Sequence, residues 1–379
     1  MLTSRLHNLL LAARCYFYFR ARGRADRRAD YPQKVLIVQI AKLGDMVSTT
    51  PIFRAFKEKY PGSKLFVLGD AVNKEVLANN TDVAEYIIWT KNFSEMKKAL
   101  KFEKFDFALL VGPSPELLAL LYLSGIPHIA APVLEGGYSP LQTRAYRLLT
   151  RLVDTRPHKA GGYAPREYLR LLETVGIYSE NTKKNLSYSQ YGKEQALKFY
   201  KENGIKIGSD FVVGIFPSTG YKIKLWGRDK FARVAEWLWR NHKAKIILIG
   251  SEADRKEVEE FLSYSPREMD LANAFNAFNI DEFKAAISMM SLFISVDSGP
   301  IYIAEAFGIP TIDIVGPMND LDQPPRGPKN IIIKAERKTP AITILNTRDI
   351  DVEEAHRQSE DISAKMVISE IKKLISIIK

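Results

Sequence analysis

Short apolar runs alternate with longer stretches of helical periodicity along most of the chain. The run KVLIVQI at 34–40 is typical of a buried strand, and the stretch at 43–62 has the pattern of a turn and a helix. A second strand at 64–69 completes a strand-helix-strand unit, which predicts a parallel sheet with a right-handed crossover. The same alternation continues with strands and helices at 86–89, 94–102, 105–112 and 115–123.

A second series of the same kind follows helices expected at 165–176 and 189–203. Its strands are expected at 211–217, 245–250, 291–297 and 311–316. The pattern predicts an α/β protein with two Rossmann-like, doubly wound domains facing a central cleft, at 31–190 and 205–355. The last segment, 361–379, has the period of an amphipathic helix and is expected to pack back toward the N-terminal domain.

The first 30 residues form a basic arm. Seven arginines face two aspartates there, and apolar residues recur at helical spacing: Leu6, Leu9, Leu10, Ala13 and Phe17. This favours a helix lying in a membrane surface with its arginines on lipid phosphates, while a helix packed on its own protein or on a partner is the alternative. Arg14 interrupts the apolar run too early for a signal peptide, and a bilayer span needs about 20 apolar residues.

Composition narrows the class of partner. A length of 379 residues fits two domains, and Cys15, as the single cysteine, excludes a disulfide framework and a thiolate metal cluster. The formal net charge of +11 indicates an anionic partner, which could be phospholipid, a phosphorylated substrate or nucleic acid. Nucleic acid is disfavoured because the basic residues form no aromatic-interleaved or recognised motif.

The loop after the first strand, QIAKLGDMVSTTP, places Gly44 and Asp45 at the start of a helix. An aspartate there is a common helix cap, which contributes about 1 kcal/mol. The functional interpretation is a general base, a carboxylate that takes a proton from an acceptor hydroxyl. The two roles are compatible, because a capped carboxylate is also well oriented.

Two loops of the second series offer groups for a diphosphate. After the first strand of that series, a tight turn with exposed hydroxyl and N–H groups is followed by two lysines: Ser218, Thr219, Gly220, Lys222 and Lys224. Cations beside such a turn bind a diphosphate and stabilise its departing charge, although an ordinary basic loop over Trp226 has the same pattern. Later, Asp297, Ser298 and Gly299 turn into a helix whose N-terminus suits a phosphate, or form only a well-built connection.

Two further stretches allow both a structural and a functional interpretation. Glu252 and Asp254 open a helix, where a carboxylate either holds ribose hydroxyls or caps the helix. The stretch at 136–165 is rich in Gly, Pro and basic residues, among them Arg144 and Arg147. It is either a solvated helix with a loop or a cationic patch for an anionic acceptor.

With these motifs, the chain resembles the ADP-heptose:lipopolysaccharide heptosyltransferases, glycosyltransferase family nine. The resemblance covers 34–318 and the terminal helix, and rests on KVLIVQIAKLGDMVSTTPIFRAFKEKYP, FPSTGYKIKLWGRDKFARVAEWL and FISVDSGPIYIAEAFGIPTIDIVGP. It implies a GT-B architecture with the acceptor on the N-terminal domain and the nucleotide sugar on the C-terminal one. It also implies inverting transfer without metal or cofactor, from ADP-heptose to a lipopolysaccharide-core or related glycolipid, by a cytoplasmic enzyme peripheral on the inner membrane.

The resemblance assigns Asp45 as the base and places the family's donor-side positions on Lys224, Glu252, Asp297, Ser298 and Gly299. Tyr302 departs from the family, which has His three residues after the glycine, and a tyrosine imitates that donor only through its hydroxyl. Either Tyr302 donates to the phosphate or sugar, or specificity or activity differs. Residues 319–361 also depart, which leaves the acceptor open. A nucleotide-sugar epimerase or hydrolase and an inactive binding protein are the competing interpretations.

Overall fold

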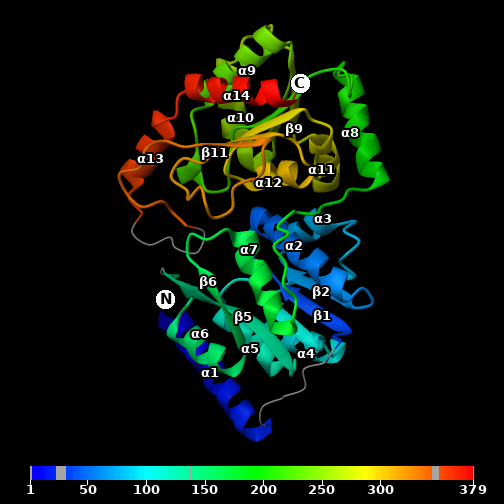
Figure 1. The fold of residues 1–379 in the computed structure, drawn as a ribbon, viewed down its shortest axis with the longest axis vertical. Helices are drawn as coiled ribbons and strands as arrows, with labels where there is room; N and C mark the ends of the chain where they lie inside the picture. Colours follow the sequence, from blue (N-terminus) through cyan, green and yellow to red (C-terminus); the bar gives the residue numbers. More distant parts are fainter. Residues whose placement is uncertain (1, 23–30, 137–138, 344–349, 379) are drawn as a thin grey trace. The chain divides into compact units, whose positions relative to one another are not determined.

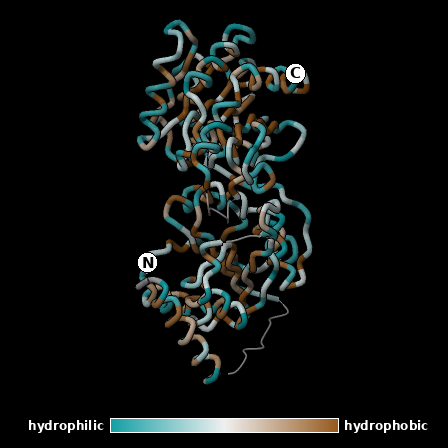
Figure 2. Tube along the Cα trace, turned by 90° about the vertical axis from the view of Figure 1, so that its left-hand side faces the viewer, coloured by the Kyte–Doolittle hydropathy of each residue, from teal (hydrophilic) through white to brown (hydrophobic). Residues whose placement is uncertain are grey.

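The computed structural model describes residues 2–22, 31–136, 139–343 and 350–378 (Figure 1). These residues divide into two compact units, with the boundary between Lys184 and Asn185, and the described C-terminal segment from Ile350 belongs to the second unit. Each unit holds a six-stranded parallel sheet, and hydrophobic residues concentrate in the interior of each unit (Figure 2). The predicted pair of doubly wound α/β domains is confirmed.

The sheet of the first unit has the strand order β3-β2-β1-β4-β5-β6. In the central strand β1, Leu36 pairs with Phe66 on one side and with Ala108 on the other. A strand covered on both faces is apolar throughout, which explains why its sequence shows no alternation. The strands are β1 (Lys34–Val38), β2 (Lys64–Gly69), β3 (Glu85–Ile88), β4 (Phe107–Leu110), β5 (His128–Glu135) and β6 (Asp154–Lys159).

The helices of this unit start where local chemistry places them. Ser114 accepts a hydrogen bond from the amide of Leu117 at the start of α5, and Pro115 occupies the first helical position, where no N–H is needed. After α1 (Leu2–Arg22), the helices are α2 (Leu43–Lys59), α3 (Ala71–Leu77), α4 (Phe93–Glu103), α5 (Pro115–Leu123), α6 (Arg144–Leu149) and α7 (Ala164–Leu169).

The stretch at 136–165, expected to be either a solvated helix with a loop or a cationic patch, also contains the edge strand β6. Its residues pair in register with β5, so that Arg156 lies opposite Pro132 and His158 lies opposite Leu134. An edge strand with one partner tolerates polar residues, which is why its sequence lacks an apolar run.

The second unit repeats the topology, with the strand order β12-β11-β10-β7-β8-β9. Its strands are β7 (Val212–Phe216), β8 (Lys245–Gly250), β9 (Leu271–Phe275), β10 (Leu292–Val296), β11 (Thr311–Ile314) and β12 (Asn330–Ile333). Its helices are α8 (Gln190–Glu202), α9 (Arg228–His242), α10 (Arg255–Tyr264), α11 (Ile280–Ser288), α12 (Gly299–Ala306), α13 (Val352–Asp361) and α14 (Ala364–Ile378). Helix α8 packs on α11, where the Tyr200 hydroxyl donates to the carbonyl of Ala286 over 2.6 Å.

The C-terminal helix, which the sequence led us to expect to pack back toward the N-terminal domain, contributes to the core of the second unit. α14 lies against α9 and β12 of the second unit, and Val367, Ile371 and Leu374 are buried in its core. The link from α13 to α14 is fixed by Trp226, whose indole N–H donates to the carbonyl of Ile362 over 2.7 Å. The apolar stripe of α14 therefore covers an apolar surface of its own unit.

The described part of the N-terminal arm is helix α1 (Leu2–Arg22), which packs on the first unit against α5 and α6. Leu11, Ala12 and Cys15 are buried in that core, and burial raises the pKa of the Cys15 thiol to about 12. One face of α1 thus follows the alternative expectation, a helix that packs on its own protein. Residues 23–30 of the expected arm lie outside the described residues. In the described ranges, every helix is too short or too polar to cross a bilayer.

Candidate functional site

The sequence candidates gather at the two topological switch points of the fold. Strand order reverses between β1 and β4 in the first sheet and between β7 and β10 in the second. At such a point the two following loops leave toward opposite faces, and ligands of open α/β sheets bind in the crevice that results. Gly44 and Asp45 follow β1, the turn with Ser218 follows β7, and Asp297 follows β10.

Lys224 joins the two loops of the second switch point. It ends a 3₁₀ turn, η3 (Lys222–Lys224), and its ammonium donates to the Asp297 carbonyl oxygen over 2.7 Å and to Asp297 Oδ2 over 3.0 Å. The side chains of Lys224 and Asp297 are 15% and 12% exposed. This mostly buried ion pair places one positive and one negative charge between the loops that follow β7 and β10.

Tyr302 lies behind this ion pair. Its hydroxyl donates to Asp297 Oδ1, and the residue is 4% exposed on the buried face of α12. Sequence reasoning considered a phosphate or a sugar as its partner, and the structure shows a carboxylate of the same loop instead. Whether Tyr302 also contacts a ligand stays a prediction.

The turn before α12 offers backbone groups rather than a hydroxyl. Ser298 stands at the N-cap of α12, makes no side-chain cap, and shares a hydrogen bond of 2.9 Å with the hydroxyl of buried Ser295. Pro300 has no N–H, so the amides at the start of the helix are those of Ser298 and Gly299. The positive end of a helix beside Lys224 favours an anion.

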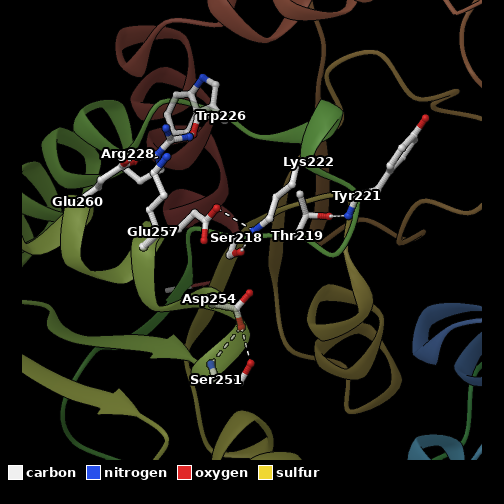
Figure 3. A network of polar contacts seen from close by, with 11 residues as sticks. Ser218, Thr219, Tyr221, Lys222, Trp226, Arg228, Ser251, Asp254, Glu257 and Glu260 are labelled. Atoms are coloured by element: carbon white, nitrogen blue, oxygen red, sulfur yellow. Dashed lines mark hydrogen bonds and ion pairs between the residues drawn. The ribbon is translucent and has the colours of Figure 1, made fainter.

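The turn after β7 differs from the expectation of exposed hydroxyls (Figure 3). Ser218 and Thr219 are 0% and 2% exposed, and Gly220 is the exposed member of the turn. Thr219 Oγ1 accepts from the amide of Tyr221 over 3.4 Å, so its hydroxyl serves the turn itself. The hydroxyls are buried because the turn is fastened from within, and a ligand here would meet mainly backbone groups.

Glu257 is a residue that sequence reasoning missed. It lies on α10, is 5% exposed, and accepts from the Lys222 ammonium over 2.7 Å (Figure 3). Lys222 also lies 3.5 Å from the Ser218 hydroxyl oxygen. The predicted topology could have indicated Glu257. The helix that follows β8 crosses back over the sheet toward β7, the strand next to β8.

Glu252 and Asp254, after β8, take different roles. Glu252 is exposed and accepts from Arg255 over 2.6 and 2.8 Å and from Asn276 over 2.9 Å. The hydrogen bonds from Arg255 lower the pKa of Glu252, so it is an ionised acceptor at neutral pH. Asp254 accepts from the amide and hydroxyl of Ser251 and is a helix cap.

Asp45 is the third residue of α2 and is half-buried, while Gly44 before it is buried. The N-cap position belongs to Lys42, so Asp45 lies within the first turn rather than at the cap. The loop before it is held by Gln39, which donates to Thr49 over 3.2 Å, and by Asn73, which donates to the carbonyl of Ala41 over 2.7 Å. The element that carries Asp45 is therefore well fixed.

The basic residues of the stretch at 136–165 differ in their surroundings. Arg144 and Arg147 are exposed on α6, whereas Arg156 is paired with Glu173 over 3.2 Å. His158 is buried, and burial together with Arg170 lowers its pKa to about 4, so it is neutral at pH 7. Within the residues that the structure describes, no group of three or more His, Cys, Asp or Glu side chains could hold a metal ion.

Comparison with known proteins decides the family. The model for glycosyltransferase family 9 (heptosyltransferase) matches residues 95–348, more than half of the chain. The chain belongs to glycosyltransferase family 9. The chain is therefore a glycosyltransferase, and the resemblance seen in its motifs is confirmed. The family 9 match spans both loops of the second switch point, while Asp45 lies upstream of it.

Individual family 9 relatives and solved structures support this. The chain is 25% identical over 282 residues to lipopolysaccharide heptosyltransferase 3 of Escherichia coli K12, covering 72% of this chain and 79% of the relative. The family 9 structure from Veillonella parvula has a TM-score of 0.75 at 19% identity, covering 90% and 97%. The E. coli heptosyltransferase WaaC with ADP-2-deoxy-2-fluoro heptose has a TM-score of 0.63 at 15% identity, covering 90% and 99%. These neighbours have the GT-B fold that the motifs predicted.

Proposed function

We propose that this family 9 enzyme transfers heptose from ADP-heptose to a hydroxyl of a lipopolysaccharide-core or related glycolipid acceptor. The main support for a donor site is the Lys224–Asp297 ion pair. It joins both loops of the second switch point, beside the start of α12. Its positive charge and the helix terminus suit a diphosphate. This choice of donor is supported by a relative that is a lipopolysaccharide heptosyltransferase and by the WaaC structure with ADP-2-deoxy-2-fluoro heptose.

The proposed reaction is a single displacement with inversion. The acceptor oxygen attacks the anomeric carbon while its proton passes to the Asp45 carboxylate. The bond from that carbon to the diphosphate oxygen breaks, and its electron pair leaves with ADP. Lys224 and the amides before α12 stabilise the charge on the leaving diphosphate, which makes the proposed reaction independent of metal and cofactor.

Replacing Asp45 tests the base. Asp45→Asn should reduce transfer at least a hundredfold, the usual contribution of a general base, and leave ADP affinity within about twofold because the donor loops are in the other unit. Transfer is measured by product formation and affinity by calorimetry. Glu58→Gln, an exposed change near the end of the same helix, is the matched control. A variant that keeps transfer would remove Asp45 from the role of base.

Incubation of the enzyme with ADP-heptose alone distinguishes a transferase from a nucleotide-sugar epimerase or hydrolase. A transferase releases little ADP without an acceptor, and ADP release should rise when the glycolipid is added. Fast release, or an epimerised sugar, in the absence of acceptor would favour the other class. Tight ADP binding without turnover on any acceptor would favour an inactive homologue.

We further propose that the enzyme is cytoplasmic and peripheral on the inner membrane, with α1 lying on the lipid surface. One face of α1 is buried, but Leu6, Leu10 and Phe17 are 61%, 57% and 72% exposed. At 100° per residue these three form a stripe opposite Cys15. The exposed Arg14 and, farther along, Arg20 flank the stripe, as expected for a helix on anionic lipid.

The neighbouring helix adds to this surface. α6 packs against α1 and carries the exposed Arg144 and Arg147. These arginines were expected on the acceptor side, and a glycolipid acceptor presents its anionic groups at the membrane. Binding of anionic glycolipid on the side of α1 and α6 therefore extends the same proposal.

A further inference from the structure

Three side chains from three parts of the second unit form a continuous chain of hydrogen bonds. Tyr302 on α12 donates to Asp297 Oδ1, and Lys224 on η3 donates to Asp297 Oδ2 and to its carbonyl oxygen. The carboxylate is therefore held from two sides, by a neutral hydroxyl at one oxygen and by an ammonium at the other. A carboxylate with both oxygens bonded has little freedom to rotate.

These hydrogen bonds fix the orientation of the Lys224 ammonium group. An ammonium has three N–H donors, and two of those of Lys224 are used by Asp297 in the described part of the chain. Fixing two donors fixes the direction of the third. The side chain of Lys224 is 15% exposed, whereas residue Tyr302 is 4% exposed. The lysine is therefore the more accessible of the two, and the tyrosine lies behind Asp297.

We propose that Tyr302 is a positioning residue, whose hydroxyl fixes Asp297 and thereby aims the Lys224 ammonium at the diphosphate of the donor. The proposal rests on the donor site proposed above. Position 302 holds a tyrosine because the group behind Asp297 has to donate a hydrogen bond without adding a second positive charge to an ion pair that is already balanced. Tyr302 acts through Lys224, not by touching the donor.

A double-mutant cycle tests whether the effect of Tyr302 on the ligand passes through Lys224. Tyr302→Phe keeps the ring and removes the hydroxyl, and it should weaken ADP binding about tenfold, the loss of one hydrogen bond to a charged group. In a Lys224→Met background the same change should alter ADP affinity less than twofold, because its effect passes through the lysine. A tenfold loss in both backgrounds would mean that the hydroxyl contacts the ligand directly, and would overturn the proposal.

Tyr200→Phe is the matched control for the cycle. Tyr200 is also a buried tyrosine of this unit, with its hydroxyl on the carbonyl of Ala286. It should lower thermal stability in the same way as Tyr302→Phe and leave ADP affinity unchanged. Equal loss of ADP affinity in both variants would show a general effect on folding and contradict a positioning role.

A measurement without ligand separates this proposal from the proposed function. Acetylation of Lys224 by acetic anhydride, followed by mass spectrometry, reports how often the ion pair opens. Tyr302→Phe should accelerate labelling of Lys224 about fivefold, because the carboxylate is then held from one side only, and labelling of the exposed Lys256 should stay constant. If the wild-type protein binds no ADP, the donor site fails while the labelling still decides the positioning. An unchanged labelling rate overturns the positioning role whatever ADP does.

Discussion

At the scale of single residues, the second unit contains a buried aspartate that no pattern in the sequence predicts. Asp313 on β11 is fully buried, and neither carboxyl oxygen has a hydrogen-bond partner among the described residues. Burial and the nearby Asp297 raise its pKa well above the ordinary value, against the opposing charge of Lys224, and Glu305 adds to the rise. The buried site therefore favours the protonated, neutral form of Asp313.

This predicts how stability depends on pH. Below the unfolded pKa of about 4, Asp313 is protonated in both states, so its ionisation does not change the free energy of unfolding. As pH rises further, the unfolded chain releases the proton that the folded chain retains, so the free energy of unfolding falls until the folded pKa is reached. Asp313→Asn should therefore raise the melting temperature at pH 7 by several degrees and change it little at pH 4.

Asp320→Asn is the control with the opposite sign. Burial acts to raise the pKa of Asp320, but hydrogen bonds from Lys334 and Arg337 lower it overall. Its ionised form stabilises the fold at neutral pH, and this contribution disappears as pH falls through the lowered pKa. Asp320→Asn should lower the melting temperature at pH 7. A stabilisation by Asp313→Asn that is equal at both pH values would contradict a buried neutral acid.

At the scale of elements, α1 is a helix with two apolar faces. Leu11 and Cys15 contribute to the core of the first unit, and the opposite stripe with Leu10 and Phe17 is exposed. A single apolar face would explain packing or membrane contact, but not both. The sequence indicated apolar residues at helical spacing, and only the packing against α5 and α6 shows which of them remain available.

Vesicle binding tests the exposed face of α1. The full chain should sediment with vesicles of phosphatidylglycerol and phosphatidylcholine in equal parts and bind pure phosphatidylcholine weakly. Phe17→Glu should weaken binding about tenfold, since it removes an apolar contact and adds a repelled charge. Phe102→Glu, at a residue 83% exposed on α4 of the same unit, should have no effect. Binding that survives Phe17→Glu, or a change of oligomeric state alone, would contradict lipid as the partner.

At the scale of the whole molecule, both sheets have the same strand order and place their candidate groups at equivalent points. The proposed base follows the first strand of one unit, and the proposed donor loops follow the first and fourth strands of the other. In the proposed mechanism, proton transfer and donor binding therefore depend on residues of different units. Donor binding can therefore be measured through the stability of the chain, independently of transfer.

A thermal-shift comparison uses this separation. A ligand that binds the folded state at a hundred times its dissociation constant stabilises by about 2.7 kcal/mol. That corresponds to a rise of about 5 °C or more in the melting temperature of a unit of this size. ADP should give this rise, and GDP and UDP should give less at equal concentration. A larger rise in melting temperature with GDP or UDP would indicate that the nucleobase of the donor is guanine or uracil rather than adenine.

The sequence by itself determined the two α/β units, most of their central strands and helices, and the loops that carry the candidate groups. These follow from apolar periodicity and turn residues, which are local properties of the chain. Only the tertiary structure showed the strands β5, β6, β9 and β12, the unit against which α14 packs, and the partners of Lys222 and Tyr302. The edge strand β6 carries no continuous apolar run in its sequence DTRPHK. Glu257 reaches Lys222 across 35 positions, and a contact between residues that far apart depends on how the elements pack.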